Sequence, residues 1–237
     1  MSTRIRPPTN TSLTPILLAC GVAYAVAYVV VNDVVAAGLY EGYDPVSQAV
    51  SELSATGSPA TSFLTAVFPI WPLLLTAFGV GVRRAAGGRR ALRVTGDLLI
   101  AHAIVGLLWL AFPMTSRADM APGAPATVND VGHIVMTVVT LVFIVSQIGF
   151  SAAAFGWRFR LYATVSAVAF VVFGALTGVQ ARTVSTGGPT PWMGLFERLS
   201  IASWLLWMVV LAVMLMTHGD AERVGSGDTV RSRAVDG

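Results

Sequence analysis

Six long runs of apolar residues, separated by short polar or glycine- and proline-rich stretches, dominate the chain. They cover residues 15–37, 62–82, 96–114, 131–155, 161–181 and 198–217. About 20 mostly apolar residues are enough to cross the hydrocarbon core of a membrane. The runs show no alternation of period two, and a backbone in lipid must satisfy its own hydrogen bonds, so helices are expected. The pattern predicts an all-α integral membrane protein built as a bundle of six transmembrane helices.

The arginines give this bundle a direction. The chain has 15 basic residues, all arginine, and in a six-span arrangement twelve of them fall on one side. Only Arg117, Arg182 and Arg198 fall on the other. The positive-inside rule then puts both termini in the cytoplasm. The absence of lysine and the abundance of alanine, glycine and valine suggest a GC-rich bacterial genome, so a bacterial plasma membrane is expected. The expected parts are a cytoplasmic segment 1–14, a membrane domain 15–217 and a disordered cytoplasmic tail 218–237, rich in glycine, serine and charge.

Composition excludes several classes of protein. Charged residues make up 11% of the chain, far below the share in soluble domains, and no continuous basic patch suggests nucleic-acid binding. The single cysteine rules out an internal disulfide and a zinc site built on cysteines. His102 and His133 lie at different expected depths in the membrane. No metal and no cofactor is therefore expected, and the oligomeric state is left open.

The stretch between the first two runs is acidic and rich in turn-forming residues. Asp44 and Pro45 are typical of the start of a helix, and Gly57 and Pro59 of its end. Apolar residues at helical spacing predict a short extracytoplasmic amphipathic helix over 44–56. In the second run, Pro69 and Pro72 predict a kink or local opening.

Polar residues gather at the same extracytoplasmic level. Asp33 lies within a run of valines, where an acid normally faces the bundle interior and needs a partner; Arg182 or Arg198 would serve. The candidate ligand-binding residues are Asp33, Ser51, Glu52, Asp130, His133, Arg182, Glu197 and Arg198. Each also has a structural explanation, such as helix capping, ion pairing or contact with lipid headgroups.

Three motifs resemble the DUF998 family of small prokaryotic membrane proteins with about six helices. They are GYDPVSQAVSELSATGSP after the first run, DVGH at the head of the fourth and GLFERLSIASWLLW leading into the sixth. The resemblance implies this fold and topology from about residue 15 to 217. It marks Ser51, Glu52, His133, Glu197 and Arg198 as family-like positions and implies no chemistry.

Four functions are compatible with these patterns. The favoured one is binding of a membrane lipid or small amphipathic ligand. Arg182 and Arg198 would bind an anionic headgroup, and the apolar interior of the bundle would take the tail. Residues 44–56 would form a lid in which Glu52 and Ser51 point at Arg198, Glu197 and His133. The second is a hydrolase or transferase acting on a lipid-linked substrate, with Ser51 as nucleophile and His133 or Glu52 as base. The others are a proton-coupled carrier and a structural or partner-binding subunit. Whether the protein is an enzyme is left undecided.

Overall fold

The computed structural model of the 237-residue chain describes residues 13–121, 123, 125–184 and 186–235, with side chains described up to residue 217. Within these residues it contains helices and connecting loops, and six helical segments are long and apolar enough to cross a membrane. They are Leu13–Leu39, Thr61–Ala85, Arg90–Ala111, Val128–Ala153, Trp157–Val184 and Met193–Thr217. The predicted all-α, six-helix class is confirmed.

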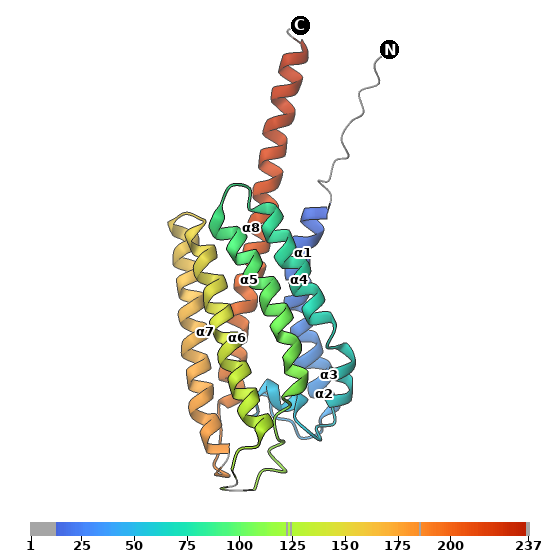
Figure 1. The fold of residues 1–237 in the computed structure, drawn as a ribbon, viewed down its shortest axis with the longest axis vertical. Coiled ribbons are helices and arrows are strands. Elements are labelled where there is room, and N and C mark those ends of the chain that lie inside the picture. Colours follow the sequence, from blue (N-terminus) through green and yellow to red (C-terminus); the bar gives the residue numbers. More distant parts are fainter. Residues whose placement is uncertain (1–12, 122, 124, 185, 236–237) are drawn as a thin grey trace.

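The helices pack on their neighbours in chain order, and the last closes on the first (Figure 1). The helices are α1 (Leu13–Val29), α4 (Ile70–Ala85), α5 (Arg90–Gly106), α6 (Val128–Ala153), α7 (Trp157–Val184) and α8 (Met193–Val235). The start of α1 and the end of α8 lie at one end of the bundle, which we call the terminal end. We call the opposite end, where the loops 40–60, 112–127 and 185–192 meet, the distal end.

Helix α8 contributes more buried side chains to the core than any other helix. In the most apolar 18 residues of Met193–Thr217, 44% of the residues are buried, against 17–28% in the corresponding part of the other five spans. Trp207, Met208, Leu211 and Ala212 are fully buried, and Phe78 of α4 packs into the same cluster. The outward faces of the other helices carry exposed valines and leucines, as expected for surfaces in contact with lipid.

The second span is interrupted where the prolines predict it. Helix α3 (Thr61–Val67) ends two residues before Pro69, and α4 begins at Ile70. Proline lacks the N–H that a continuous helix requires, and its ring clashes with the preceding turn. The predicted break in this span is confirmed.

The first span contains a wide turn that the apolar pattern does not reveal. Residues Val30–Ala36 form a π-helix, η1, and the short helix α2 (Ala37–Leu39) completes the span. The N–H of Ala37 donates to the carbonyl of Asn32, five residues earlier. The Asn32 side chain donates to the carbonyl of Tyr28 at 2.9 Å. Such a turn inserts a residue into the helix and is often found at functional sites, because it redirects the side chains around it.

The predicted amphipathic helix after the first span is present but shorter than 44–56. Its helical part is the 3₁₀ helix η2 (Val50–Ser54), preceded by a turn. The carboxylate of Asp44 accepts from the N–H of Val46 at 3.0 Å and from the hydroxyl of Ser47 at 2.6 Å. Asp44 therefore stabilises a tight turn, and these bonds also lower its pKa. Val50 and Leu53 turn inward and make a small second core with Leu64.

Helix α8 continues past the bundle to Val235 and projects from the end at which α1 begins (Figure 1). Of residues 218–235 the structure describes the backbone alone. The disorder expected of 218–237 stays a prediction, and residues 1–12 lie outside the described part of the chain.

Candidate functional site

An ion pair between the first and last spans lies at the distal end. The Nε of Arg198 donates to Oδ1 of Asp33 at 2.8 Å, and the two side chains are 18% and 29% exposed. Asp33 is in the π-helix η1, and Arg198 is five residues into α8, about 8 Å from the helix start at 1.5 Å per residue. Both charges therefore lie inside the spanning segments. The sequence offered Arg182 or Arg198 as the partner of Asp33, and the structure selects Arg198.

Arg198 also fixes the loop that follows the first span. Its Nη1 donates to the carbonyls of Pro45 at 2.7 Å and Gln48 at 3.3 Å. Its Nη2 donates to the hydroxyl of Tyr43 at 2.9 Å, and that hydroxyl donates to the carbonyl of Ala49 at 2.8 Å. Burial raises the pKa of Tyr43 to about 12, so the phenol stays protonated and available as a donor.

A small cavity lies beside this ion pair. It has a volume of about 110 Å³ and is lined by Tyr28, Val29, Asp33, Val50, Arg198, Ile201, Ala202 and Leu205. Tyr28, Asp33 and Arg198 contribute polar groups, and the remaining residues give an apolar wall. Val29 is 46% exposed on the outside of the first span, whereas Leu205 is 5% exposed and belongs to the core. The cavity thus lies between the outer surface of α1 and the buried face of α8.

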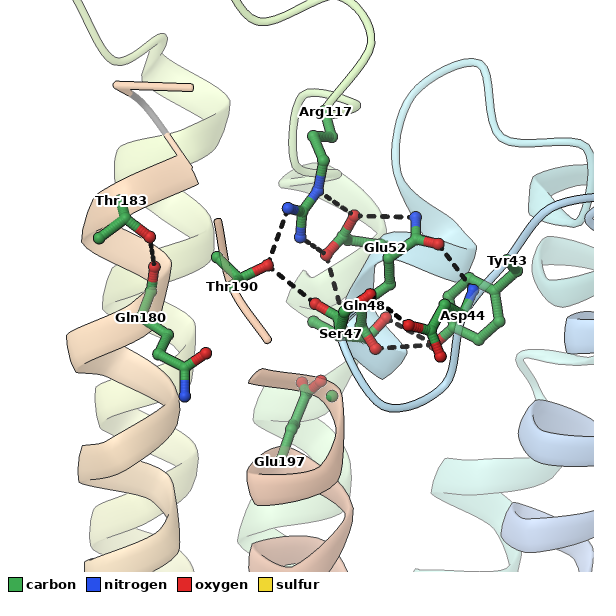
Figure 2. A network of polar contacts seen from close by, with 12 residues as sticks. Tyr43, Asp44, Ser47, Gln48, Glu52, Arg117, Gln180, Thr183, Thr190 and Glu197 are labelled. Atoms are coloured by element: carbon green, nitrogen blue, oxygen red, sulfur yellow. Dashed lines mark hydrogen bonds and ion pairs between the residues drawn. The ribbon is translucent and has the colours of Figure 1, made fainter. Parts of the chain in front are cut away.

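A second ion pair joins three loops of the distal end (Figure 2). Arg117, between α5 and α6, donates to both oxygens of Glu52, at 3.0 Å through Nε and 2.7 Å through Nη2. Its Nη1 donates to the hydroxyl of Thr190 at 2.8 Å, and Thr190 donates to the carbonyl of Ser47 at 2.9 Å. The hydrogen bonds to Glu52 raise the pKa of Arg117.

Protein donors surround the Glu52 carboxylate. Besides Arg117, it accepts from the N–H of Ala49 at 3.0 Å and from the side-chain amide of Gln48 at 3.4 Å. The side chain of Glu52 is 3% exposed. An ionised carboxylate at such a depth requires paired donors of this kind. Glu52 thus orders the loop and has little surface left for a ligand.

Glu197 contacts the start of η2. Its carboxylate accepts from the N–H of Val50, and the N–H and hydroxyl of Ser51 lie against it. Glu197 therefore satisfies the free amides at the beginning of this short helix. The adjacent residues bring α8 still closer to the loop, because the N–H of Leu195 donates to the carbonyl of Val46 at 3.0 Å.

Asp130 and His133 open α6 and stabilise the loop before it. Asp130 accepts from the N–H of Thr115 at 2.8 Å and forms a capping box with Thr127. Nδ1 of His133 lies 3.2 Å from the carbonyl oxygen of Phe112, and the imidazole packs edge-on against Trp109. These contacts fix the end of α5 to the start of α6.

The predicted lid contacts are corrected in part. Ser51 lies against Glu197 as expected, but Glu52 is paired with Arg117 and His133 is directed to Phe112. In the described residues no hydrogen bond joins Ser51 to His133 or to Glu52, so the suggested nucleophile and bases are not assembled. Arg182 is exposed in the last turn of α7 and does not line the cavity beside the Asp33–Arg198 pair.

Arg117 is a charged distal-end residue that the sequence analysis missed as a candidate. It lies in an irregular loop and was noted only as one of three arginines on that side. The excess of acids over bases there was the available signal, since a buried Glu52 requires a cation.

Two further polar groups lie away from this end. Nδ1 of His102 is 3.1 Å from the side-chain amide nitrogen of Gln147, and this nitrogen also donates to the carbonyl of Leu98. The indole N–H of Trp204 donates to the side-chain oxygen of Gln147 at 3.3 Å. Asp97 pairs with Arg83 near the terminal end. Over the described residues there is no group of three or more histidine, cysteine, aspartate and glutamate side chains placed to hold a metal ion.

The fold and the distribution of its polar groups define a multi-pass α-helical membrane protein with a structured polar cap opposite the termini. Comparison with protein families identifies it further. The chain belongs to the family described as a protein of unknown function, DUF998, whose pattern matches residues 19–214. No curated protein matches the chain, and no solved structure matches it.

Proposed function

We propose that the protein binds a lipid or another amphipathic molecule in the cavity between η1 and α8. The observation that carries this proposal is a half-buried Asp33–Arg198 pair lining a cavity of about 110 Å³ whose other wall is apolar. Charged side chains within membrane spans are rare and usually functional, because removing them from water has a large energetic cost. An amphipath offers both the polar and the apolar groups that such a cavity requires.

Close packing supports a ligand at this position. Protein interiors leave few voids larger than a water molecule. Trp207 and Leu211 of the bundle core are completely buried, whereas a cavity lies beside Asp33. A wide π-turn at this depth also moves the backbone of the first span away from a regular path, and such turns are often retained for function.

The volume of the cavity restricts how the ligand would lie. Pockets that enclose a whole small molecule typically have about 300–1,000 Å³, so this cavity suits a headgroup alone. The tail would extend over the lipid-facing surface of the first span, where Val26, Val29 and Val30 are 58%, 46% and 45% exposed. The expected binding of the tail inside the bundle is therefore replaced by binding along its outside.

Filling the cavity tests this proposal without removing a charge. Ala202 lines the cavity, and Ala202→Leu adds three carbon atoms at its wall. The matched control is Ala175→Leu, at an exposed position of α7. Native mass spectrometry of the proteins, purified in mild detergent, should show a defined lipid or metabolite on the wild type and on Ala175→Leu. Occupancy of Ala202→Leu should fall at least about tenfold, a difference of about 1.4 kcal/mol in binding. Equal occupancy in all three proteins would contradict the proposal.

We also propose that the termini face the cytoplasm and the distal end faces outward in a bacterial plasma membrane. Twelve of the 15 arginines support this orientation, since they fall on the terminal side of the six spans. The ligand would then come from the outer leaflet or from the space beyond it.

A further inference from the structure

The Asp33 carboxylate offers a ligand in the cavity a negatively charged acceptor. Oδ1 of Asp33 accepts from Arg198 at 2.8 Å. Among the residues that the structure describes, no donor is hydrogen-bonded to the second oxygen, Oδ2. Asp33 lines the cavity, and its side chain is 29% exposed. A carboxylate oxygen without a partner inside a membrane span favours a ligand that brings a hydrogen-bond donor, and a charged donor most of all.

The guanidinium of Arg198, in contrast, is directed mainly at the protein. Nε is used by Asp33, Nη1 by the carbonyls of Pro45, Gln48 and Gly194, and Nη2 by the hydroxyl of Tyr43. A guanidinium has five N–H donors, and these contacts leave one N–H of Nη2 without an acceptor among the described residues. An anionic headgroup that binds Arg198 through two N–H groups, as the sequence favoured, would have to displace a contact that fixes the loop. The polarity of the open group is therefore opposite to that expectation.

We propose that the headgroup in this cavity carries a primary ammonium, as in phosphatidylethanolamine, and that the ammonium donates to Oδ2 of Asp33. This rests on the proposed function, of which it specifies the ligand. A primary ammonium is small enough for a cavity of about 110 Å³ and has three N–H donors. A trimethylated ammonium has none, and an anionic headgroup is repelled by the carboxylate. The apolar residues Ile201, Ala202 and Leu205 in the same wall favour a lipid over a free amine.

Comparison of headgroups on the wild-type protein gives the first test. Phosphatidylethanolamine, phosphatidylcholine and phosphatidylglycerol with identical acyl chains are titrated onto the delipidated protein and followed by native mass spectrometry. We expect phosphatidylethanolamine to bind about tenfold more tightly than either of the others, the factor expected of one charge-assisted hydrogen bond. Glycerophosphoethanolamine, which lacks the chains, should bind at least about tenfold more weakly than the lipid; equal binding would overturn the choice of a lipid.

Asp33→Asn supplies the second test, because it changes one atom of the site. Asparagine keeps an oxygen for Nε of Arg198 and replaces the other oxygen by a donor. The variant should bind the three lipids with equal affinity, whereas Asp97→Asn, which removes an acid at the opposite end of the bundle, should keep the preference. Should Asp33→Asn not fold, the wild-type comparison decides alone.

The outcomes separate this inference from the proposed function. If Ala202→Leu abolishes lipid binding but the wild type shows no preference for the primary ammonium, the cavity binds lipid and the headgroup assignment is wrong. If phosphatidylglycerol binds most tightly, the assignment is wrong in sign, and Arg198 is the recognising group. If neither a lipid nor another amphipathic molecule binds the wild type, both proposals fail.

Discussion

Replacing Arg117 by alanine would leave the Glu52 carboxylate buried without its cation. Two charge-assisted hydrogen bonds, at 3.0 and 2.7 Å, are lost from a side chain that is 3% exposed. Breaking a buried pair typically costs about 3–5 kcal/mol. Because Arg117 is itself 32% exposed, we reduce the expected loss of stability to about 2–3 kcal/mol. For a chain of this size that lowers the thermal midpoint by about 4–12 °C.

The assay is thermal unfolding in detergent, followed by tryptophan fluorescence at a fixed scan rate. Arg83→Ala is the matched control, because it also removes an arginine from an ion pair, but from one whose side chains are 51% and 50% exposed. That exposed pair is expected to contribute at most about 1 kcal/mol. With Glu52→Gln as the second arm of a double-mutant cycle, the coupling to Arg117 should exceed about 1.5 kcal/mol. A midpoint shift for Arg117→Ala no larger than that for Arg83→Ala would refute the reasoning.

Two further predictions concern packing and orientation. Gly194→Ala should lower the stability by about 1–3 kcal/mol, and the thermal midpoint with it, because the added Cβ would collide with the backbone carbonyl of Gln48. Gly178→Ala, whose added Cβ meets nothing within 4 Å, should leave the midpoint unchanged. In a cysteine-free background, Ser54→Cys in the distal loop should react with a membrane-impermeant maleimide on intact cells, and Gly88→Cys at the terminal end should react only after permeabilisation. The reverse labelling pattern would invert the proposed orientation.

The spans were predictable because their signal is long and redundant. About twenty apolar residues in a row have few alternatives to a membrane helix, and the arginine distribution gives the same topology independently. The break at Pro69 followed from a backbone property of one residue type. The predicted partners of Asp33 included Arg198, since a buried acid requires a base and few bases are present on that side.

The contacts of the loops could not be predicted in the same way. Loop 112–127 has no periodicity, so nothing in the sequence places Arg117 beside Glu52, which is 65 residues away. The same holds for the extent of the helix after the first span. Its predicted start, Asp44, accepts hydrogen bonds from Ser47 and Val46 and closes a turn. The helix η2 begins instead at Val50, whose amide donates to Glu197, 147 residues further along the chain. The local sequence pattern predicted that a short helix follows the first span, and contacts with residues distant in the sequence determine how long that helix is.

The two ion pairs of the distal end differ in what they leave open, and this difference separates support from binding. Glu52 accepts from Arg117, Ala49 and Gln48 and is almost completely enclosed, so its charge is fully used by the fold. Asp33 accepts through one oxygen and borders a cavity with the other unbonded among the described residues. The same loop is thus held from two sides, by Arg117 and by Arg198. Because Arg117 does not line the cavity, changes there should alter stability and leave the headgroup preference intact, whereas changes at Asp33 should alter the preference.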